Sequence, residues 1–292
     1  MSPAALDTFP SLDAMPSLNV SALLRSYDIH PDKSLGQNFL VEDSWLRKIV
    51  NISEISDQLS VLEIGPGLGS LTRYLAEKSD KVIAVELDER LLPPLGSVLS
   101  KYQNVEIIQG DILDKDPDHL ISAEEYVVVA NIPYYITSAI IRHLLEASKR
   151  PLRMILTVQS EVAERICAQP NKMSLLALSV QLYGHPEIKC NIPASAFYPL
   201  PNVDSATVRV DIYPKPVIAD QNIKAFFRLA KAGFSQKRKT LRNALAGGMG
   251  WSKDKSEKLL ETAGINPKRR AETLSLEEWS TLVEQSQNLF SA

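Results

Sequence analysis

The sequence predicts an α/β fold in which a mostly parallel, doubly wound sheet precedes a small helical domain. Five short segments rich in valine and isoleucine are separated by helical or linking segments; they span residues 61–64, 81–86, 105–109, 126–130 and 153–158. Strands that alternate with helices are typical of parallel sheets covered on both faces. The chain has 292 residues, which is enough for two domains of unequal size.

Three divisions of the chain are expected, at residues 1–20, 21–213 and 214–292. The first is a loose extension with scattered proline and serine, and the second contains the sheet. Residues 187–212 continue the second division as extended structure, and residues 213–216 form a linker with two prolines. From Asn222 the pattern is helical to the end, with breaks expected at residues 247–250 and 264–267.

Composition excludes several classes of protein. With 45% hydrophobic and 23% charged residues, the chain has an ordinary globular composition. Its first 24 residues lack lysine and arginine, so neither a secretory signal nor a transit peptide is expected, and no apolar run predicts a membrane span. Cys167 and Cys190 form no paired motif, so we expect idle thiols, no metal site and a cytoplasmic protein.

The net charge of −3 conceals an asymmetry along the chain. Residues 221–292 hold 13 basic and 7 acidic side chains, a balance of +6, whereas the remaining 19 and 28 give −9. Residues 221–253 alone hold 8 basic and no acidic side chains. This separation indicates that the C-terminal part meets nucleic acid or another acidic surface.

A glycine-rich turn, Gly-Pro-Gly-Leu-Gly at residues 65–69, follows the first predicted strand. Its three glycines allow the backbone to turn sharply and to approach a ligand closely. The dinucleotide fingerprint would require a further glycine where Ser70 stands, which argues against a pyrophosphate. The helix that follows is expected to bury Leu71 and Leu75 and to keep Arg73 off its buried face.

Carboxylates stand near the ends of three successive predicted strands: Glu63 in the first, Glu86 ending the second and Asp111 following the third. Ligands of doubly wound sheets bind beyond the carboxyl ends of the strands. Glu86 could accept both hydroxyls of a ribose, and Asp111 could accept from an adenine amine. One strand-end acid alone is more often merely solvated, but three together suit a cationic ligand. This favours S-adenosylmethionine, a sulfonium, over NAD.

The tetrapeptide Asn131-Ile132-Pro133-Tyr134 follows the predicted strand 126–130 and is a candidate site for an adenine. The Asn131 side-chain oxygen and the Ile132 carbonyl could both accept from an exocyclic amine, while Pro133 shapes the turn. The ring of Tyr134 could stack on the base, which is worth roughly 1–3 kcal/mol. Taken alone, the tetrapeptide is explained about as well by a plain turn.

In this order, the motifs resemble those of the class I methyltransferases that act on adenine, which have a Rossmann-like sheet. Three further segments resemble the ribosomal RNA adenine dimethylase family; they are residues 35–40, 197–206 and 234–245. The resemblance covers roughly residues 24–280 and is greatest to the members that act on small-subunit rRNA. It implies dimethylation of two adjacent adenines in the 3′-terminal hairpin of that RNA, during ribosome biogenesis, by a monomer.

The resemblance also implies how the chain holds S-adenosylmethionine as methyl donor. Asn38 and Leu40 would close over its methionine end, and Gly65 would contact it through the backbone. Glu86 would hold the ribose and Asp111 the adenine.

Four residues would meet the target base. By resemblance, Asn131 faces both cofactor and target, and Phe197 provides a stacking face opposite Tyr134. Pro133 keeps its role in the turn. Family members often have asparagine where Tyr135 stands, which leaves open the role of this position.

Basic side chains of the C-terminal part are expected to contact RNA phosphates. Three lie at helical spacing on one face and four follow in a segment without acids; they are Lys224, Arg228, Lys231, Lys237, Arg238, Lys239 and Arg242. A solvated helix face would explain any one of them. An uncompensated cluster favours phosphate contacts, which position an RNA without reading its sequence.

Four rival functions stay open. A methylase of large-subunit rRNA that confers antibiotic resistance is disfavoured by the segment 234–245. A non-catalytic assembly factor is disfavoured by the intact Asn131 and Tyr134. No segment resembles a duplex-reading domain of a DNA adenine methylase, and Ser70 argues against a dehydrogenase.

Overall fold

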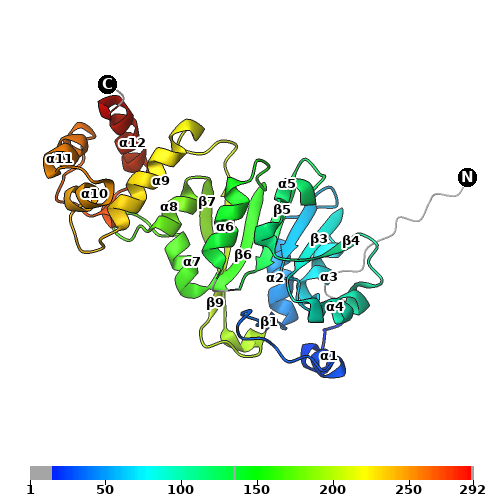
Figure 1. The fold of residues 1–292 in the computed structure, drawn as a ribbon. Helices are drawn as coiled ribbons and strands as arrows, with labels where there is room; N and C mark the ends of the chain where they lie inside the picture. The colour runs from blue at the N-terminus through cyan, green and yellow to red at the C-terminus, as the bar shows by residue number, and fades with distance from the viewer. Residues whose placement is uncertain (1–14, 134–135, 291–292) are drawn as a thin grey trace, which may run out of the picture. The chain divides into compact units, whose positions relative to one another are not determined.

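The computed structural model describes residues 15–133 and 136–290 (Figure 1). Most of the predicted N-terminal extension therefore lies outside the described residues. So do Tyr134 and Tyr135, which leaves the predicted stacking face of Tyr134 without a structural description.

The central sheet has seven strands in the order β4-β3-β2-β5-β6-β9-β7. Their bounds are β2 Ser60–Ile64, β3 Lys81–Glu86, β4 Val105–Gln109, β5 Tyr126–Asn131, β6 Arg153–Gln159, β7 Gly184–Ile192 and β9 Ser205–Ile212. Strands β2 to β6 pair in parallel. All five predicted strands and the parallel sheet are confirmed. Four of the strands are almost entirely buried, as Val/Ile-rich strands of a sheet covered on both faces are, whereas β4 at the edge of the sheet is partly exposed.

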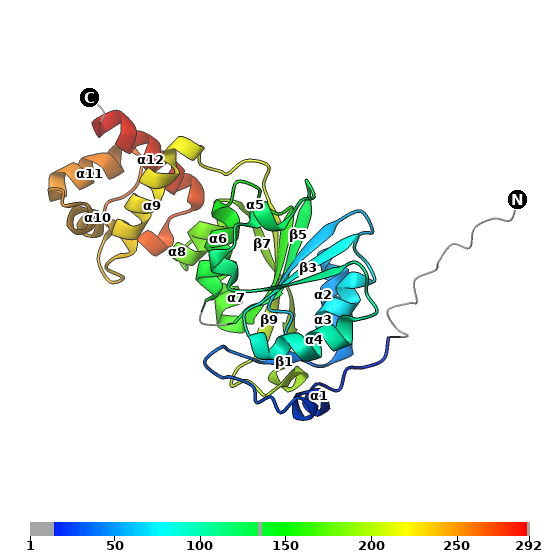
Figure 2. The same cartoon turned by 45° about the vertical axis from the view of Figure 1, so that its right-hand side comes forward.

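Helices cover both faces of this sheet (Figures 1 and 2). On one face, α2 (Asp43–Ser53) and α3 (Ser70–Ala76) share a core with alternate residues of the strands, among them Val61, Val82 and Val127. Helix α6 (Thr137–Glu146) lies on the opposite face, and α4 (Leu92–Leu99) and α5 (Pro117–Leu120) connect further strands. The strand order reverses at β2, which places a crevice beyond the carboxyl ends of β2 and β5.

Helix α3 is buried more completely than its pattern predicts. Leu71 and Leu75 are buried as expected, but so is Arg73, which is only 6% exposed. Its Nη1 donates to the Pro16 carbonyl at 2.9 Å, so a segment preceding α1 (Val20–Ser26) covers this side of the helix. The expectation that Arg73 lies off the buried face is wrong because this covering segment is distant in sequence.

A second sheet of two short strands joins parts of the chain that are far apart in sequence. Strand β1 (Phe39–Leu40) runs antiparallel to β8 (Phe197–Tyr198), with Leu40 opposite Phe197. This pairing fixes the segment 35–40, which carries part of the family resemblance, beside the segment 197–206.

By compactness the chain divides into two units. The first holds residues 1–160 and 188–209, and the second holds residues 161–187 and 210–292. Strands β7 and β9 each run from one unit into the other. The two compact units therefore differ from the division of the chain expected after residue 213. The domain boundary at that residue stays a prediction.

The second unit is mainly helical, as expected, and Figure 2 shows its last four helices gathered together. Its helices are α7 Ser160–Ile166 at its border, α8 Leu175–Gln181, α9 Asp220–Phe234, α10 Leu241–Met249, α11 Lys253–Thr262 and α12 Leu276–Phe290. Among the described residues, short 3₁₀ turns are η2 Glu89–Leu91, η3 Ile112–Asp114, η4 Ala194–Ala196 and η5 Ala271–Thr273. None of the described helices is both long and apolar enough to span a membrane.

The predicted break at residues 247–250 is only partly correct. Helix α10 continues through Gly247 and Gly248 and ends at Gly250, whose φ of 67° is left-handed. A Cβ at Gly248 would lie 2.6 Å from the Ala232 Cα, so this glycine allows α9 and α10 to pack closely. The helical pattern also breaks between α9 and α10, where no break was predicted. Gly264, with φ of 72°, follows the end of α11, as expected from the break predicted at residues 264–267.

Candidate active site

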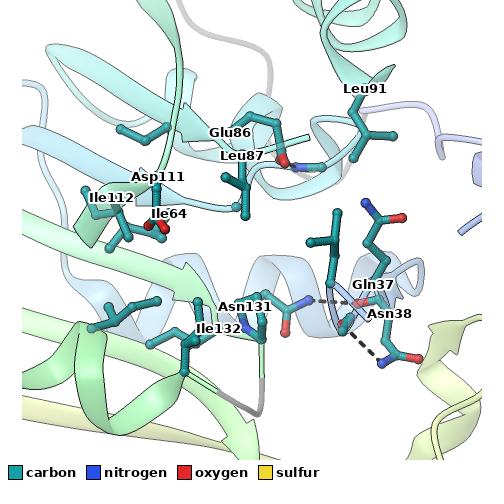
Figure 3. A pocket seen from close by; sticks show the side chains of 18 of the residues that line it. Gln37, Asn38, Ile64, Glu86, Leu87, Leu91, Asp111, Ile112, Asn131 and Ile132 are labelled. Atoms are coloured by element: carbon teal, nitrogen blue, oxygen red, sulfur yellow. Dashed lines mark hydrogen bonds between the residues drawn. The ribbon is translucent and has the colours of Figure 1, made fainter. Parts of the chain in front are cut away.

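A cleft of about 790 Å³, counted to its open mouth, lies at the carboxyl ends of the central strands (Figure 3). It is lined from the ends of β2, β3, β4 and β5 and from the segment before β1; the polar lining residues are Gln37, Asn38, Glu86, Asp111 and Asn131. Four of the predicted cofactor residues, Asn38, Glu86, Asp111 and Asn131, are thereby brought together, and Gly65 lines the same cleft.

Glu86 is held at the end of β3 by two backbone hydrogen bonds. Its Oε2 accepts from the Gly67 N–H at 2.9 Å, and its Oε1 accepts from the Asp88 N–H at 2.8 Å. Burial raises the pKa of this carboxyl, and the two N–H groups oppose that effect by stabilising the charged form. The carboxylate is thus oriented in advance at the cleft wall, as an acceptor for ribose hydroxyls requires.

Glycine geometry brings the turn after β2 close to the other walls. Gly67 has φ of 60°, and a Cβ there would lie 2.9 Å from the Phe39 ring. Gly65, with φ of 72°, would carry a Cβ 3.7 Å from the Asn131 carbonyl oxygen. Both positions require glycine for their backbone conformation, and the first also for space.

Side-chain hydrogen bonds hold the segment before β1 against the turn after β3. None of these side chains was among the site residues predicted from the sequence. Gln37 Nε2 donates to Asp88 Oδ2 at 2.7 Å, and Gln37 Oε1 accepts from the Asp32 N–H at 2.7 Å. Arg90 pairs with Asp88, with Nη2 at 2.7 Å from Oδ2, and this lowers the pKa of Asp88. Asp88, two residues after Glu86, could have been suspected from its place at the strand end.

Asp111 lies beside an apolar slot. Its Oδ1 accepts from the Leu113 N–H at 2.9 Å and so caps the short turn η3, which fixes the carboxylate at the cleft. Leu87, Ile112 and Ile136 line the same cleft and supply flat apolar surface suited to a purine. These three residues were not predicted from the sequence, although two of them directly follow the strand-end acids.

The Asn131 carboxamide has a defined orientation. Its Nδ2 donates to the Asn38 backbone carbonyl at 3.0 Å (Figure 3). A carbonyl can only accept, so the amide nitrogen must face Asn38 and Oδ1 remains an acceptor for a ligand. The Ile132 N–H donates to the Thr157 carbonyl at 3.1 Å, which fixes the start of the turn that carries Pro133.

Leu40 and Phe197 are not in the cleft. They face each other in the β1–β8 pair, are 5% and 4% exposed, and pack in one core cluster with α2 and α3. Leu40 lines a smaller adjoining cavity that shares Gly65 and Asn131 with the cleft. Since this structure keeps the Phe197 ring in the core, a stacking role for it stays a prediction.

Glu63 does not belong to the cofactor cleft either. It is 2% exposed and lines the smaller cavity, and burial raises its pKa to about 8. At neutral pH its carboxyl is therefore mostly protonated. The expectation of three charged carboxylates around the cofactor is wrong, because only Glu86 and Asp111 reach the cleft.

The predicted RNA-binding residues lie in the second unit. Six of them are exposed on α9 or in the loop before α10; they are Lys224, Arg228, Lys231, Lys237, Arg238 and Lys239. Arg242 differs, because its Nη1 lies 2.9 Å from Glu257 Oε2 of α11. The prediction that this arginine lacks a compensating acid is wrong, since the acid comes from the next helix.

The lining of the cleft fits an adenosyl cofactor without phosphates. It offers an apolar slot, an oriented carboxylate and acceptors, and none of the described residues that line it is lysine or arginine. A pyrophosphate would find no cation there. Fold and cleft together define a class I S-adenosylmethionine-dependent methyltransferase.

Comparisons with known proteins give the particular family. The model of the family described as ribosomal RNA adenine dimethylase matches residues 30–288. "Ribosomal RNA small subunit methyltransferase A" of Dehalococcoides mccartyi strain CBDB1 is 45% identical over 270 residues, covering 91% of this chain and 93% of that protein. The chain belongs to the ribosomal RNA adenine dimethylase family, which uses S-adenosylmethionine as methyl donor.

Two solved structures share the fold over most of their length. The 23S rRNA methyltransferase ErmE matches with a TM-score of 0.69 at 28% identity, covering 85% of this chain and 98% of that one. A dimethyladenosine transferase from Plasmodium falciparum matches with a TM-score of 0.73 at 26% identity, covering 85% and 96%.

Proposed function

We propose that this protein dimethylates the exocyclic nitrogen of adenines in small-subunit rRNA, two adjacent adenines of the 3′-terminal hairpin, during ribosome biogenesis. The observation that carries the proposal is the Asn131 carboxamide, oriented by the Asn38 carbonyl at the edge of a cleft that fits an adenosyl cofactor. The choice of small-subunit RNA rests on relatives of 45% and 42% identity named for that subunit, against 28% for the 23S enzyme.

The chain would bind the cofactor through groups already in place. Glu86 would accept from the ribose hydroxyls, Asp111 from the adenine amine, and the Gly65 backbone and Asn38 would face the methionine end. Bound S-adenosylmethionine supplies an electrophilic methyl group on a sulfonium. Two acidic groups and no basic side chain among the described lining residues suit that positive charge.

Asn131 and Ile132 would orient the target amine. The lone pair of an adenine amine is delocalised into the ring, which makes the nitrogen a weak nucleophile. Hydrogen bonds from this amine to Asn131 Oδ1 and the Ile132 carbonyl would favour a pyramidal nitrogen whose lone pair points toward the methyl group. Fixed acceptors of this kind commonly contribute a factor of about 10²–10³ in rate, and alignment contributes further.

The reaction requires no protein nucleophile. None of the described residues that line the cleft is histidine, cysteine or lysine. The methylated nitrogen becomes acidic as the methyl group is transferred, so its proton can leave to water without a strong general base. Two successive transfers require only that the pocket admits a monomethylated amine.

The target base must leave its helix to reach this cleft. A base stacked within a duplex cannot present its amine to Asn131, so the adenine is unpaired or flipped out. Tyr134 and Phe197 are the proposed stacking partners, and the exposed cations of α9 and the following loop would hold phosphates. We also propose that the protein acts as a cytoplasmic monomer.

The test is methyl transfer from labelled S-adenosylmethionine to unmodified small subunits, with large subunits and their free rRNA in parallel. We expect label in dimethyladenosine of small-subunit rRNA only. Label on large-subunit rRNA would instead support the function for which the 23S relative is named. Tight binding to small subunits without any label would leave a non-catalytic assembly role.

A further inference from the structure

The segment between β8 and β9 presents apolar side chains to solvent. Tyr198, Leu200 and Val203 are 41%, 68% and 45% exposed, and Leu200 is the most exposed large hydrophobic residue among those that the structure describes. We propose that Leu200 inserts into the base stack of the RNA and fills the place that the target adenine leaves when it enters the cleft. The inference rests on the proposed function, because it assumes an RNA substrate whose adenine is unstacked.

Both ends of this segment are fixed near the cofactor cleft. At its start, Tyr198 of β8 pairs with Phe39 of β1, and Phe39 lines the cleft. At its end, the Asp204 carbonyl accepts from the Ser160 N–H at 3.1 Å, and Ser160 directly follows β6. The segment that carries Leu200 therefore begins at the cleft wall and returns to the carboxyl edge of the sheet.

The end of β6 also holds the turn that is proposed to orient the target amine. Strand β6 pairs in parallel with β5, with Thr157 opposite Asn131. The Thr157 carbonyl accepts from the Ile132 N–H at 3.1 Å. Through backbone hydrogen bonds, one strand end thus contacts both the turn after Asn131 and the segment after β8. The exposed leucine belongs to the segment next to the place where the adenine would leave the RNA.

The backbone around Leu200 is restricted. Pro199 and Pro201 flank it and fix their own φ, and a residue before a proline is confined to extended conformations. Pro201 is buried, and Asp204 Oδ1 accepts from the Ala194 N–H at 2.8 Å, which secures the end of the segment. Because the projecting leucine sits on an ordered backbone, binding would immobilise little additional chain.

The chemistry of the segment indicates which part of an RNA it meets. Residues 197–203 contain no charged side chain, so they cannot hold phosphates by ion pairs. An apolar side chain can instead insert between bases and hold them apart. An enzyme that extrudes its target base loses the stacking of that base, and a side chain in the vacated place compensates part of the loss. Single exposed leucines are common on protein surfaces, but here three apolar side chains gather within residues 198–203 beside the cleft.

Leu152 provides a matched control at the other end of β6. It is 38% exposed and directly precedes this strand, whereas the segment with Leu200 returns to the end of the strand. Leu152→Ala and Leu200→Ala each shorten an exposed leucine by the same atoms. Both variants should fold and should bind S-adenosylmethionine as the wild type does, which thermal unfolding and calorimetry check.

The experiment uses small subunits in which 2-aminopurine replaces one of the two target adenines, because the fluorescence of this base rises when it leaves a stack. Full-length wild type, Leu200→Ala, Leu200→Met and Leu152→Ala are each added to saturation. We expect the full rise with the wild type, Leu200→Met and Leu152→Ala. With Leu200→Ala the rise should be at least about fivefold smaller, because the smaller side chain buries less apolar surface in the stack.

Methyl transfer to unmodified small subunits gives a second readout. At saturating subunits, the single-turnover rate of Leu200→Ala should be about 5- to 50-fold below that of the wild type, since the extruded state loses the buried leucine. Leu200→Met conserves side-chain volume and should restore most of the rate. Affinity for the subunits should fall by a smaller factor than the rate, because Leu200 acts on the base stack after docking.

Several results would overturn the inference. These are wild-type fluorescence and rate for Leu200→Ala, a loss that methionine does not restore, the same loss in Leu152→Ala, or no fluorescence rise in the saturated wild-type complex. A loss of subunit affinity as large as the loss of rate would instead identify an apolar docking contact with a ribosomal protein.

Methyl transfer by the wild type separates this inference from the proposed function. Equal transfer by wild type and Leu200→Ala would refute the role of the leucine and leave the proposed function standing. Absence of transfer by the wild type, with a fluorescence rise that still depends on Leu200, would refute the proposed function and leave the role of the leucine standing.

Discussion

At the scale of single residues, the site depends on polar side chains whose orientation is fixed by backbone groups. Glu86 accepts from two N–H groups and Asn131 donates to one carbonyl, so each presents a defined atom to the cleft before any ligand arrives. Side chains held in this way lose little conformational entropy on binding.

The Glu86→Gln substitution tests this arrangement. A glutamine keeps the shape but has only one acceptor oxygen, so either the Gly67 or the Asp88 N–H would face an amide donor. In addition, one ribose hydroxyl would meet an amide donor in place of an acceptor. A hydrogen bond to a charged group contributes about 1.5–3 kcal/mol, so the dissociation constant for S-adenosylmethionine should rise about 10- to 150-fold by calorimetry. Glu89→Gln, at an exposed position nearby, should leave it unchanged. Equal affinities of wild type and Glu86→Gln would contradict this role.

Glu63 gives a prediction for the pH dependence of stability. Its pKa rises from 4.5 to about 8 on burial, so the folded protein binds this proton more tightly than the unfolded chain does. The resulting stability is complete below about pH 4.5 and is lost as the pH rises through 8. Between pH 6 and pH 9 the free energy of unfolding of the wild type should therefore fall more than that of Glu63→Gln, measured by denaturant titration. A steeper fall in the variant would refute the raised pKa.

The polar residues that line the cleft were predictable where they depend on local order along a strand. Glu86, Asp111 and Asn131 each follow a Val/Ile-rich segment, and parallel pairing brings the ends of such segments to one edge. The burial of Phe197 and Leu40 was not predictable, because their pairing joins strands of two residues that are 157 positions apart. The hydrogen bond from Gln37 to Asp88 likewise joins residues that are far apart in sequence.

At the scale of elements, glycine has two different uses that sequence patterns do not separate. Gly250 ends α10 through its left-handed backbone, as the pattern predicts. Gly248 stays helical and serves the close approach of α9, which only the packed pair of helices reveals. The basic loop between α9 and α10 was likewise assigned to a continuous helix, because its polar residues do not oppose helix formation.

Substitution of the adjacent glycines separates these uses. Gly248→Ala places a Cβ 2.6 Å from the Ala232 Cα, and such overpacking typically costs about 1–3 kcal/mol, which exceeds the gain of up to about 1 kcal/mol in helix propensity. The variant should unfold at lower denaturant concentration than the wild type. Gly247→Ala is the matched control, since its Cβ would meet only the flexible Gln236 side chain at 3.2 Å. Equal midpoints for the two variants would refute the packing role of Gly248.

At the scale of the whole molecule, basic and acidic side chains are concentrated in different parts of the chain. The segment 221–253 is basic, while the cofactor cleft is lined by two carboxylates and no described cation. The fold class and this division were both predictable from the sequence, because they depend on composition and strand order summed over many residues. The division into compact units was not, because β7 and β9 each cross between the units.

The basic loop should contribute to RNA affinity in a salt-dependent way. Affinity for RNA falls with salt, and each lost phosphate contact should make the slope of log affinity against log salt less steep by about 0.7–0.9. The triple variant Lys237→Ala/Arg238→Ala/Lys239→Ala should therefore have a slope less steep by about 2–3. The comparison uses equilibrium binding to small subunits between low and moderate salt. Lys78→Ala, an exposed lysine of the first unit, is the control. An unchanged slope in the triple variant would exclude the loop from the RNA interface.

The most direct test of the account is the Asn131→Ala variant, measured both for S-adenosylmethionine affinity and for single-turnover methyl transfer to unmodified small subunits. Because Asn131 is assigned to the target amine and the proposed cofactor contacts of Glu86 and Asp111 stay in place, affinity should stay within a few-fold. The transfer rate should fall about 10²–10³-fold. Full retention of the transfer rate, or an equal loss of affinity and rate, would contradict the assignment of this residue to the methyl-transfer step.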